Sequence, residues 1–403
     1  PRPDIDIDEP AYTPTAEDVT TEPVIEDAFE VEEIAEEALP EEAVLEDTTE
    51  ELIPEIEVEP ITEEIAEKAA QTSDFAVFTI SRMTAEGVDH ADIKGDFYLN
   101  DRETQAITNI SNAFHKAGKK FIVLINVGNP IEVASWADKA DAILCIGLSG
   151  EQIGNSMADI FTGAVNPSGK LAVTWPVSYN DTAYSELYPD KDHAVYSDDI
   201  YVGYRYFTTF NAPAMYEFGY GLSYTEFELS SKVCCESDGN IVAIVNVKNI
   251  GDVVGKEVVQ LYYSAPQGLL GKPSRELCAF KKTKLLAPNE AETLVMSFNI
   301  NDMASFDDLG KVQKSAYILE KGTYNFYLGT SVRDAEKLDY EYIVEENTVV
   351  EQLSDWCKPF KLAKRMLADG TYEELPQGEE TYLYGINEPT DVKAPETVVP
   401  FDK

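Results

Sequence analysis

The stretch FIVLINVGNPIEVASWADKADAILCIGL, residues 121–148, contains the pattern that decides the fold of the first half of the chain. It opens with the apolar run FIVLINV (121–127) and closes with the apolar run AILCIGL (142–148). A similar run, DFAVFTI (74–80), precedes both. Short runs without polar alternation are typical of strands buried on both faces, and helical patterns between them indicate parallel βαβ units.

Helix signals fit this arrangement. Asn100 is a plausible N-cap for a helix over residues 100–117, because Asp101 and Glu103 suit its first turn and Gly118 follows its end. Further elements are expected after it: helices over 131–140 and 150–163, and a fourth strand over 169–175. We therefore predict an open α/β sandwich domain over residues 73–225, in which 181–225 is an irregular, aromatic-rich connector.

From about residue 226 the apolar pattern changes to a period of two, with turn signals between the runs. Strands are expected at 241–247, 258–263, 276–284, 292–300 and 322–328. Five or more alternating strands at this spacing predict an immunoglobulin-like or fibronectin type III-like β-sandwich over residues 226–345. The remainder, 346–403, has few periodic features and is interpreted as a tail or linker.

The acidic charge is concentrated at the start of the chain. The whole sequence has 75 Asp+Glu against 31 Lys+Arg, and residues 1–67 alone hold 26 acidic residues with one basic residue, Arg2. This predicts a disordered, acidic low-complexity tether over 1–72, with short helices near 34–39 and 61–70. Such a charge disfavours nucleic acid and anionic membranes as partners. The sequence contains no run of about 18 apolar residues, so it predicts no membrane-spanning helix.

Cysteine and histidine spacing indicates no metal site and no disulfide framework. The five cysteines include no C-x-x-C pair, which favours a reducing, cytoplasmic location. His90, His115 and His193 show no metal-ligand spacing. A dinucleotide site is disfavoured because G-x-G-x-x-G is absent, so no metal or organic cofactor is expected.

The stretch SRMTAEGVDHADIKGDFYL (81–99) is the first candidate for chemistry, because it leaves the carboxyl end of a predicted strand, where α/β sheets bind ligands. In it, Glu86 stands beside a glycine that lets the backbone project a carboxylate. From the pattern alone, a solvated polar loop is favoured over a site.

Two weaker candidates remain open. Ser149 lies in GLSGE (147–151), where Glu151 replaces the second glycine of a nucleophile elbow. The aromatic side chains of the connector either line a sugar platform or, as we favour, pack where the two domains meet.

Four phrases together carry a family resemblance: TAEGVDH (84–90), NPSGKL (166–171), DDIYVGYRYF (198–207) and FGYGLSYT (218–225). In their order and wording, residues 73–345 resemble the carboxy-terminal α/β domain and the fibronectin type III-like domain of glycoside hydrolase family 3, the β-glucosidase family. The TIM-barrel domain of that family is absent from the sequence, as is the family's opening of the α/β domain.

The resemblance implies a function. Family members are retaining, exo-acting β-glycosidases, and Glu86 matches the position of their general acid/base. The nucleophile would lie on a barrel supplied in cis or in trans, so the chain alone should be inactive, and the substrate would be a β-linked oligosaccharide or glycoside. Two departures concern the same phrase: Ala85 stands where the family has glycine, and His90 replaces a permanently charged arginine by a titratable side chain.

An alternative of a different class is also open. The chain could be a non-catalytic carbohydrate-binding or scaffold module that has lost the barrel. Neither the sugar nor the linkage can be predicted from these residues, because the contacts that select them lie on the barrel.

Overall fold

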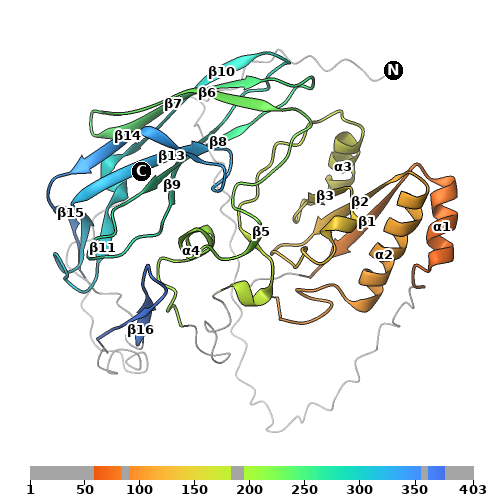
Figure 1. The fold of residues 1–403 in the computed structure, drawn as a ribbon, viewed down its shortest axis with the longest axis horizontal. Coiled ribbons are helices and arrows are strands. Elements are labelled where there is room, and N and C mark those ends of the chain that lie inside the picture. The colour runs from red at the N-terminus through yellow and green to blue at the C-terminus, as the bar shows by residue number, and fades with distance from the viewer. Residues whose placement is uncertain (1–58, 84–89, 183–194, 355–361, 377–403) are drawn as a thin grey trace, which may run out of the picture. The chain divides into compact units, whose positions relative to one another are not determined.

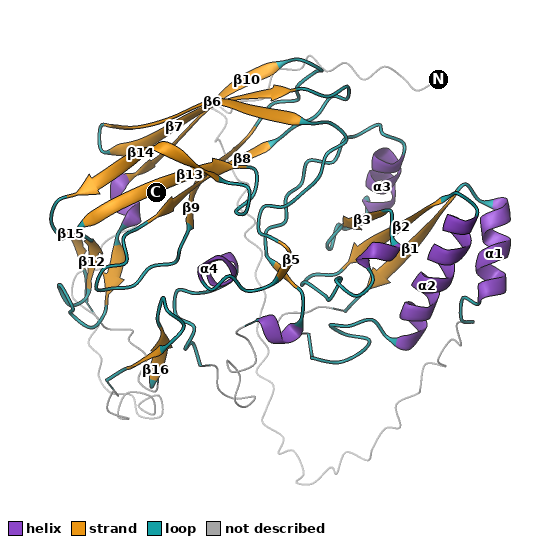
Figure 2. Ribbon diagram, viewed as in Figure 1, coloured by secondary structure: helices purple, strands orange, loops and turns teal. Residues whose placement is uncertain are grey.

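The computed structural model describes residues 59–83, 90–182, 195–354 and 362–376 (Figures 1 and 2). Its first half is built on three parallel strands, β1 (Phe75–Ser81), β2 (Lys120–Asn126) and β3 (Ala142–Cys145), in the order β1-β2-β3. The apolar runs of the sequence are therefore neighbouring strands of one parallel sheet, and the α/β prediction is confirmed.

Two helices pack together beside this sheet, α1 (Glu63–Thr72) and α2 (Asp101–Lys116) (Figure 1). The predicted cap of α2 is present: Asn100 Oδ1 accepts from Glu103 N at 2.9 Å, and Glu103 accepts in turn from Asn100 N. The helix residues that share the apolar core with the strands are Ala66, Ala70, Ile107, Ile110, Ala113 and Phe114. A shorter helix, α3 (Ile153–Phe161), lies within the helix predicted over 150–163.

Helix α1 lies in the stretch assigned to the acidic tether. Its residues Ala66 and Ala70 are nevertheless buried, and Asn109 of α2 donates to Ile61 O at 2.8 Å. Residues 63–72 are thus part of the α/β domain, as the helix predicted near 61–70 allows. Residues 1–58, which hold most of the predicted tether, are outside the described ranges.

The helix predicted over 131–140 is wrong, since only a 3-10 turn, Ala137–Lys139, forms there. The apolar spacing that suggested a helix reflects burial instead: Val133 and Trp136 are both in the core. Trp136 Nε1 donates to Glu132 O at 2.9 Å, so a side chain rather than a helical N–H uses that carbonyl.

The fourth parallel strand predicted over 169–175 is also wrong. Leu171 instead exchanges backbone hydrogen bonds with the connector, accepting from Gly219 N and donating to Tyr220 O, both at 2.8 Å. Next to it, β4 (Trp175–Pro176) pairs antiparallel with β5 (Ala214–Tyr216). The segment is extended because a distant part of the chain supplies its partners, which local spacing does not reveal.

The second half is an antiparallel β-sandwich, which confirms the predicted fold. One sheet has the order β10-β7-β6 and the other β14-β13-β8-β9. The strands are β6 (Phe227–Ser237), β7 (Asn240–Asn249), β8 (Val258–Ser264), β9 (Glu276–Lys282), β10 (Ala291–Asn299), β13 (Gly322–Gly329) and β14 (Glu336–Val344). Alternate residues of β7 are fully buried, and they pack with residues of β8, β10 and β13 in one core.

Smaller elements complete the described chain. Strands β11 (Ser305–Asp307), β12 (Ala316–Leu319) and β15 (Thr348–Gln352) form a third antiparallel sheet. Strands β16 (Lys364–Met366) and β17 (Tyr372–Glu374) form a hairpin. The 3-10 turn Tyr179–Asp181 leads into the connector, and α4 (Tyr204–Thr209) lies within it. Another 3-10 turn, Ile300–Met303, follows β10.

The interpretation of residues 346–403 as a tail or linker stays a prediction, but two described stretches of it form strands. β15 completes a sheet, and Met366 N donates to Ser197 O at 2.7 Å, which ties the hairpin to the connector. The bounds predicted for the domains stay predictions. Across the described ranges, no helix is long and apolar enough to cross a membrane.

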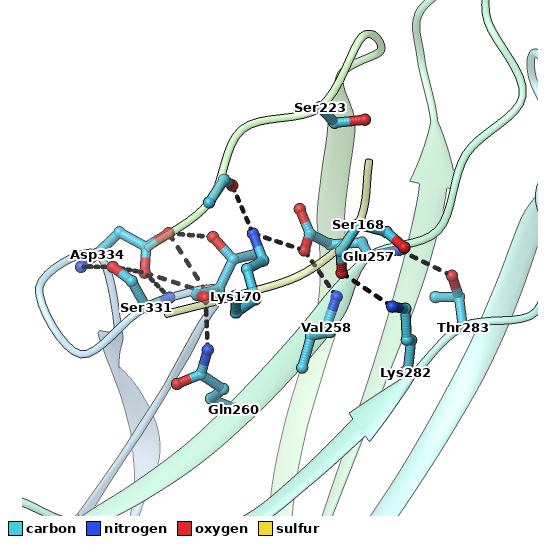
Figure 3. A network of polar contacts seen from close by, with 12 residues as sticks. Ser168, Lys170, Ser223, Glu257, Val258, Gln260, Lys282, Thr283, Ser331 and Asp334 are labelled. Carbon is cyan, nitrogen blue, oxygen red and sulfur yellow. Dashed lines mark hydrogen bonds and ion pairs between the residues drawn. The ribbon is translucent and has the colours of Figure 1, made fainter. Parts of the chain in front are cut away.

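Polar contacts join the α/β domain to the sandwich (Figure 3). Lys170 Nζ lies 2.9 Å from Glu257 Oε1 and donates to Gly221 O at 2.9 Å. Lys282 Nζ donates to Ser168 O at 2.9 Å. The side chains of Lys170 and Glu257 are each only 12% exposed, so their ion pair is shielded from solvent. We call these contacts the polar seam; they place NPSGKL directly on the sandwich.

A buried ion pair lies inside the sandwich. The side chains of Lys272 and Glu320 are 1% and 2% exposed, and the ammonium group contacts the carboxylate directly. Glu320 also accepts from the backbone N–H groups of Leu269 (2.7 Å) and Leu270 (3.3 Å). A side chain at Gly268 would collide with this carboxylate, which explains the glycine. The carboxylate is thus fully satisfied by three donors.

A second buried carboxylate organises the turn after β11. Asp307 is fully buried and accepts from the backbone N–H groups of Gly310, Lys311, Val312 and Gln313 at 2.6–3.0 Å. Burial alone would raise the pKa of Asp307, but these donors outweigh it and hold the pKa below its ordinary value.

Replacing Asp307 with asparagine should lower the free energy of unfolding by about 1–3 kcal/mol, because the amide presents an NH₂ group where two N–H donors need acceptors. The pKa of Asp307 is lower in the folded protein than in the unfolded chain. The stability that the aspartate adds is therefore present at pH values above its unfolded pKa of about 3.9, and it is lost as the pH falls through the native pKa. Denaturant midpoints of both proteins at pH 7 and pH 3 test this. Equal midpoints at pH 7 would contradict it.

Candidate active site

The parallel register fixes where the candidate loop begins. Ser81, at the end of β1, pairs with Asn126 at the end of β2, and Ile125 pairs with Cys145 at the end of β3. The three carboxyl ends therefore meet at one edge of the sheet, and the stretch 82–99 leaves from this edge. Glu86 itself lies in residues 84–89, outside the described residues. The residues that flank this segment on both sides, Arg82 and Met83 before it and His90 after it, are described.

Arg82 anchors the first end. Its side chain is 6% exposed and forms two parallel hydrogen bonds with Glu103, NH1 to Oε1 at 2.7 Å and NH2 to Oε2 at 2.9 Å. Its Nε donates to Asp96 O at 2.7 Å. Because Glu103 also caps α2, the loop entrance is tied to the start of that helix.

His90 anchors the second end. Its Nδ1 is hydrogen-bonded to the Asp96 carboxylate, whose other oxygen accepts from Ala91 N at 2.7 Å. Burial alone would raise the pKa of Asp96, but the hydrogen bonds from Ala91 and His90 outweigh it and hold that pKa below its ordinary value. Asp96 is therefore a carboxylate that orients the imidazole, with Nδ1–H as the donor.

An Arg82→Lys substitution tests the first anchor. Lysine keeps the charge but loses the two-pronged contact with Glu103, so the α/β domain should lose about 1–3 kcal/mol of stability. Fluorescence of the buried Trp136 and Trp175 during denaturant unfolding measures the change. Arg102→Lys, on an exposed neighbouring arginine, is the matched control and should leave the midpoint unchanged. An equal shift in both variants would contradict the anchoring role.

The structure does not support the other sequence candidates as catalysts. Ser149 Oγ donates to Ile146 O, a local turn contact. His115 bonds to Asp141 at 2.9 Å and to Ser111 at 3.2 Å, and is thus engaged in structural contacts. His193 lies outside the described residues. In the part of the chain that the structure describes, no cluster of three His, Cys, Asp or Glu side chains could hold a metal ion.

The interpretation of the connector aromatics as packing groups is confirmed for two of them. Tyr204 stacks on Phe218, with ring centroids 4.7 Å apart, and both pack against Tyr262 of β8. The Tyr204 hydroxyl accepts from Leu277 N at 2.8 Å. These contacts join the connector to the sandwich.

Sequence reasoning missed the roles of Arg82 and Asp96. The Asn100-x-x-Glu103 spacing predicts the cap, but it does not predict that the same glutamate accepts hydrogen bonds from Arg82, which follows β1. The spacing between Asp96 and His90 crosses an irregular turn, so no periodic pattern connects them.

Comparison with known proteins assigns the family. The model of the glycosyl hydrolase family 3 C-terminal domain matches residues 18–224, and the fibronectin type III-like domain matches residues 257–332. The chain belongs to glycoside hydrolase family 3.

Relatives of the family 3 chain are β-glucosidases by name. Beta-glucosidase A of Butyrivibrio fibrisolvens is 42% identical over 382 residues, which cover 84% of this chain and 45% of the relative. A beta-glucosidase of Ruminococcus albus is 38% identical over a match that covers 79% of this chain and 34% of the relative. The chain thus spans less than half the length of these relatives.

Solved structures of family 3 enzymes match the same region. Beta-glucosidase 3B from Thermotoga neapolitana, in complex with α-D-glucose, superposes with a TM-score of 0.67 at 42% identity, covering 74% of this chain and 42% of that one. A beta-glucosidase from Paenibacillus barengoltzii gives 0.72 at 36% identity, covering 79% and 37%. The fold of this family 3 chain is therefore that of the matching part of larger β-glucosidases.

Proposed function

We propose that this chain is part of a retaining, exo-acting β-glycosidase that hydrolyses O-glycosyl bonds, and that Glu86 is its general acid/base. The observation that carries the proposal is the double anchoring of the loop that bears Glu86. Arg82 holds one end and the His90–Asp96 pair the other, at the carboxyl edge of the parallel sheet. A carboxyl group that must donate and then accept a proton needs such fixed flanks.

The proposed reaction has two steps. In the first, protonated Glu86 gives its proton to the glycosidic oxygen while that bond to the anomeric carbon breaks and a second carboxylate forms a glycosyl ester. In the second, the Glu86 carboxylate takes a proton from water as the water oxygen displaces the ester. Retention requires the two carboxyl groups about 5–5.5 Å apart. We place the nucleophile on a TIM-barrel domain, in cis or in trans.

The substrate follows from the relatives. Those matched are named β-glucosidases, and the Thermotoga neapolitana enzyme holds glucose. A β-linked glucoside or oligosaccharide is therefore the proposed substrate.

Complementation tests the proposal. The 403-residue chain and a family 3 barrel, expressed separately and then mixed, should hydrolyse 4-nitrophenyl β-glucoside, whereas each alone should be inactive or nearly so. Gel filtration shows whether the two associate. Association without hydrolysis would favour the alternative, a module that serves as a scaffold or binds carbohydrate without cleaving it.

A further inference from the structure

The β16–β17 hairpin is fastened to the sandwich by charged side chains (Figure 1). Arg365 donates from its NH1 group to Asp308 Oδ1 at 2.8 Å and from Nε to Glu373 Oε2 at 3.1 Å. Lys311 Nζ lies 2.7 Å from Glu373 Oε1. Asp308 and Lys311 belong to the turn that the buried Asp307 organises, so the hairpin is attached to a well-ordered part of the sandwich. We call the contacts of Arg365 with Asp308 and Glu373 the clasp.

The same hairpin is also bonded to the connector. Met366 is buried, and its backbone N–H donates to Ser197 O at 2.7 Å. In the turn of the hairpin, Gly370 lies against Phe210, because a Cβ at Gly370 would be 3.8 Å from two atoms of that ring. Phe210 packs edge-on against Tyr201, with ring centroids 5.1 Å apart. The hairpin thus holds connector residues that lie before and after α4.

The connector segment in contact with the hairpin has an unfavourable backbone conformation. Residues 195–203 form neither a helix nor a strand, and Asp199 has a φ of +52°. A residue with a side chain adopts this left-handed conformation at a cost in free energy, and it persists where the surroundings impose it. Asp199 is two residues from Ser197 and within electrostatic range of Arg365. The contacts of the hairpin therefore lie where they can impose this conformation.

The same connector segment forms part of the wall of a cavity of about 440 Å³. Asp198, Tyr201, Val202 and Gly203 line this cavity, and so does His90, whose contact with Asp96 anchors the candidate loop. A displacement of the connector segment would consequently change the space beside that loop.

We propose that the hairpin is a strap, closed in this structure, which holds connector residues 197–203 in the wall of the cavity, and that Arg365 is its clasp. When the clasp breaks, the hairpin separates from Ser197, Asp199 relaxes from its left-handed conformation, and this part of the wall moves. The clasp suits such a transition because the side chain of Asp308 is 41% exposed, so water can replace its contact with Arg365. This inference rests on contacts between described residues and is independent of the proposed hydrolysis.

Hydrogen exchange of the 403-residue chain, followed by mass spectrometry of its peptides, tests the proposal. Arg365→Gln removes the charge of the clasp. The peptides that contain Met366 and Tyr201 should then exchange about 10-fold faster, as expected for one lost charge-assisted hydrogen bond, while peptides of β7 should be unchanged. Tyr201 N is a suitable reporter of the wall, since it donates to Asp198 O at 3.0 Å.

A second variant breaks the clasp from the sandwich side. Asp308→Asn leaves the hairpin sequence intact and keeps Glu373 as a partner of Arg365, so it should accelerate the same two peptides about threefold or more. A role of Arg365 confined to stabilising the hairpin itself would leave the Tyr201 peptide unchanged in this variant. Should Arg365→Gln fail to fold, Asp308→Asn decides by the same criteria.

Arg333→Gln is the matched control. Arg333 also joins the sandwich to the connector, but it donates to Ala214 O at 3.2 Å rather than contacting residues 197–203. Its substitution should therefore leave both reporter peptides unchanged. Three results would each overturn the proposal: unchanged exchange of the Tyr201 peptide when the clasp is removed, equal acceleration of the β7 peptides, or an effect of Arg333→Gln as large as that of Arg365→Gln.

Discussion

Replacing Glu86 with glutamine in the enzyme assembled with its barrel is expected to lower kcat/KM for an alkyl β-glucoside by about 10²–10⁴-fold. The amide keeps the size of the side chain but cannot deliver a proton to the departing alkoxide. Initial rates with methyl β-glucoside measure the loss. Glu151→Gln is the matched control, because Glu151 is an exposed glutamate beyond the end of β3, and its substitution should leave the rate unchanged.

The leaving group separates a catalytic role of Glu86 from a structural one. An aryl glucoside with an acidic phenol needs little proton donation, so the first step should remain fast in the variant and the glycosyl ester should accumulate. Azide, which attacks without base assistance, should then restore turnover and yield a glycosyl azide. A Glu86→Gln enzyme that loses activity toward alkyl and aryl glucosides equally, and whose activity azide does not restore, would contradict the acid/base assignment.

Replacing Lys272 with methionine is expected to lower the free energy of unfolding of the sandwich by about 3–5 kcal/mol. Lys272 and Glu320 are both almost fully buried, so the substitution leaves a carboxylate without its cation in the interior. Leu269 N and Leu270 N still donate to that carboxylate, but neutral N–H groups do not replace the charge. Denaturant unfolding followed by far-ultraviolet circular dichroism measures the shift.

Two further variants distinguish charge from packing. The double variant Lys272→Met with Glu320→Gln keeps an oxygen for the two N–H donors and removes the buried charge, so it should recover most of the loss. Lys337→Met breaks a half-exposed pair with Glu341 on β14 and should cost at most about 1 kcal/mol. A Lys272→Met shift no larger than that of Lys337→Met would contradict a dominant role for the buried pair.

The elements that could be predicted are those whose cause is local in sequence. Helix α2 was predictable within one residue at each end, because Asn100 and Glu103 are three residues apart and Gly118 follows. The strands of the parallel sheet and of the sandwich follow from apolar runs and from alternation. The segments at 131–140 and 169–175 were mispredicted because backbone groups in each bond to distant parts of the chain. Glu132 N donates to Phe97 O, and Leu171 exchanges hydrogen bonds with Gly219 and Tyr220.

The same reason limits what could be predicted of the site. The resemblance of TAEGVDH to the family phrase pointed to Glu86, but the side-chain contacts that hold its loop join residues 6 to 21 positions apart. Arg82 reaches Glu103 across 21 positions, a separation that no local pattern signals. The candidate residue could be named from a short phrase of sequence, whereas the side chains that hold its loop are brought together only by the fold.

The polar seam has a consequence for how these two domains can be recombined. Lys170 belongs to one domain and Glu257 to the other, and their side chains, each 12% exposed, neutralise each other where solvent screens the pair only weakly. A foreign fibronectin type III-like domain that lacks a carboxylate at the position of Glu257, grafted after residue 225, would leave Lys170 without its ion-pair partner. Exchange of the second domain therefore requires that a carboxylate be kept opposite Lys170.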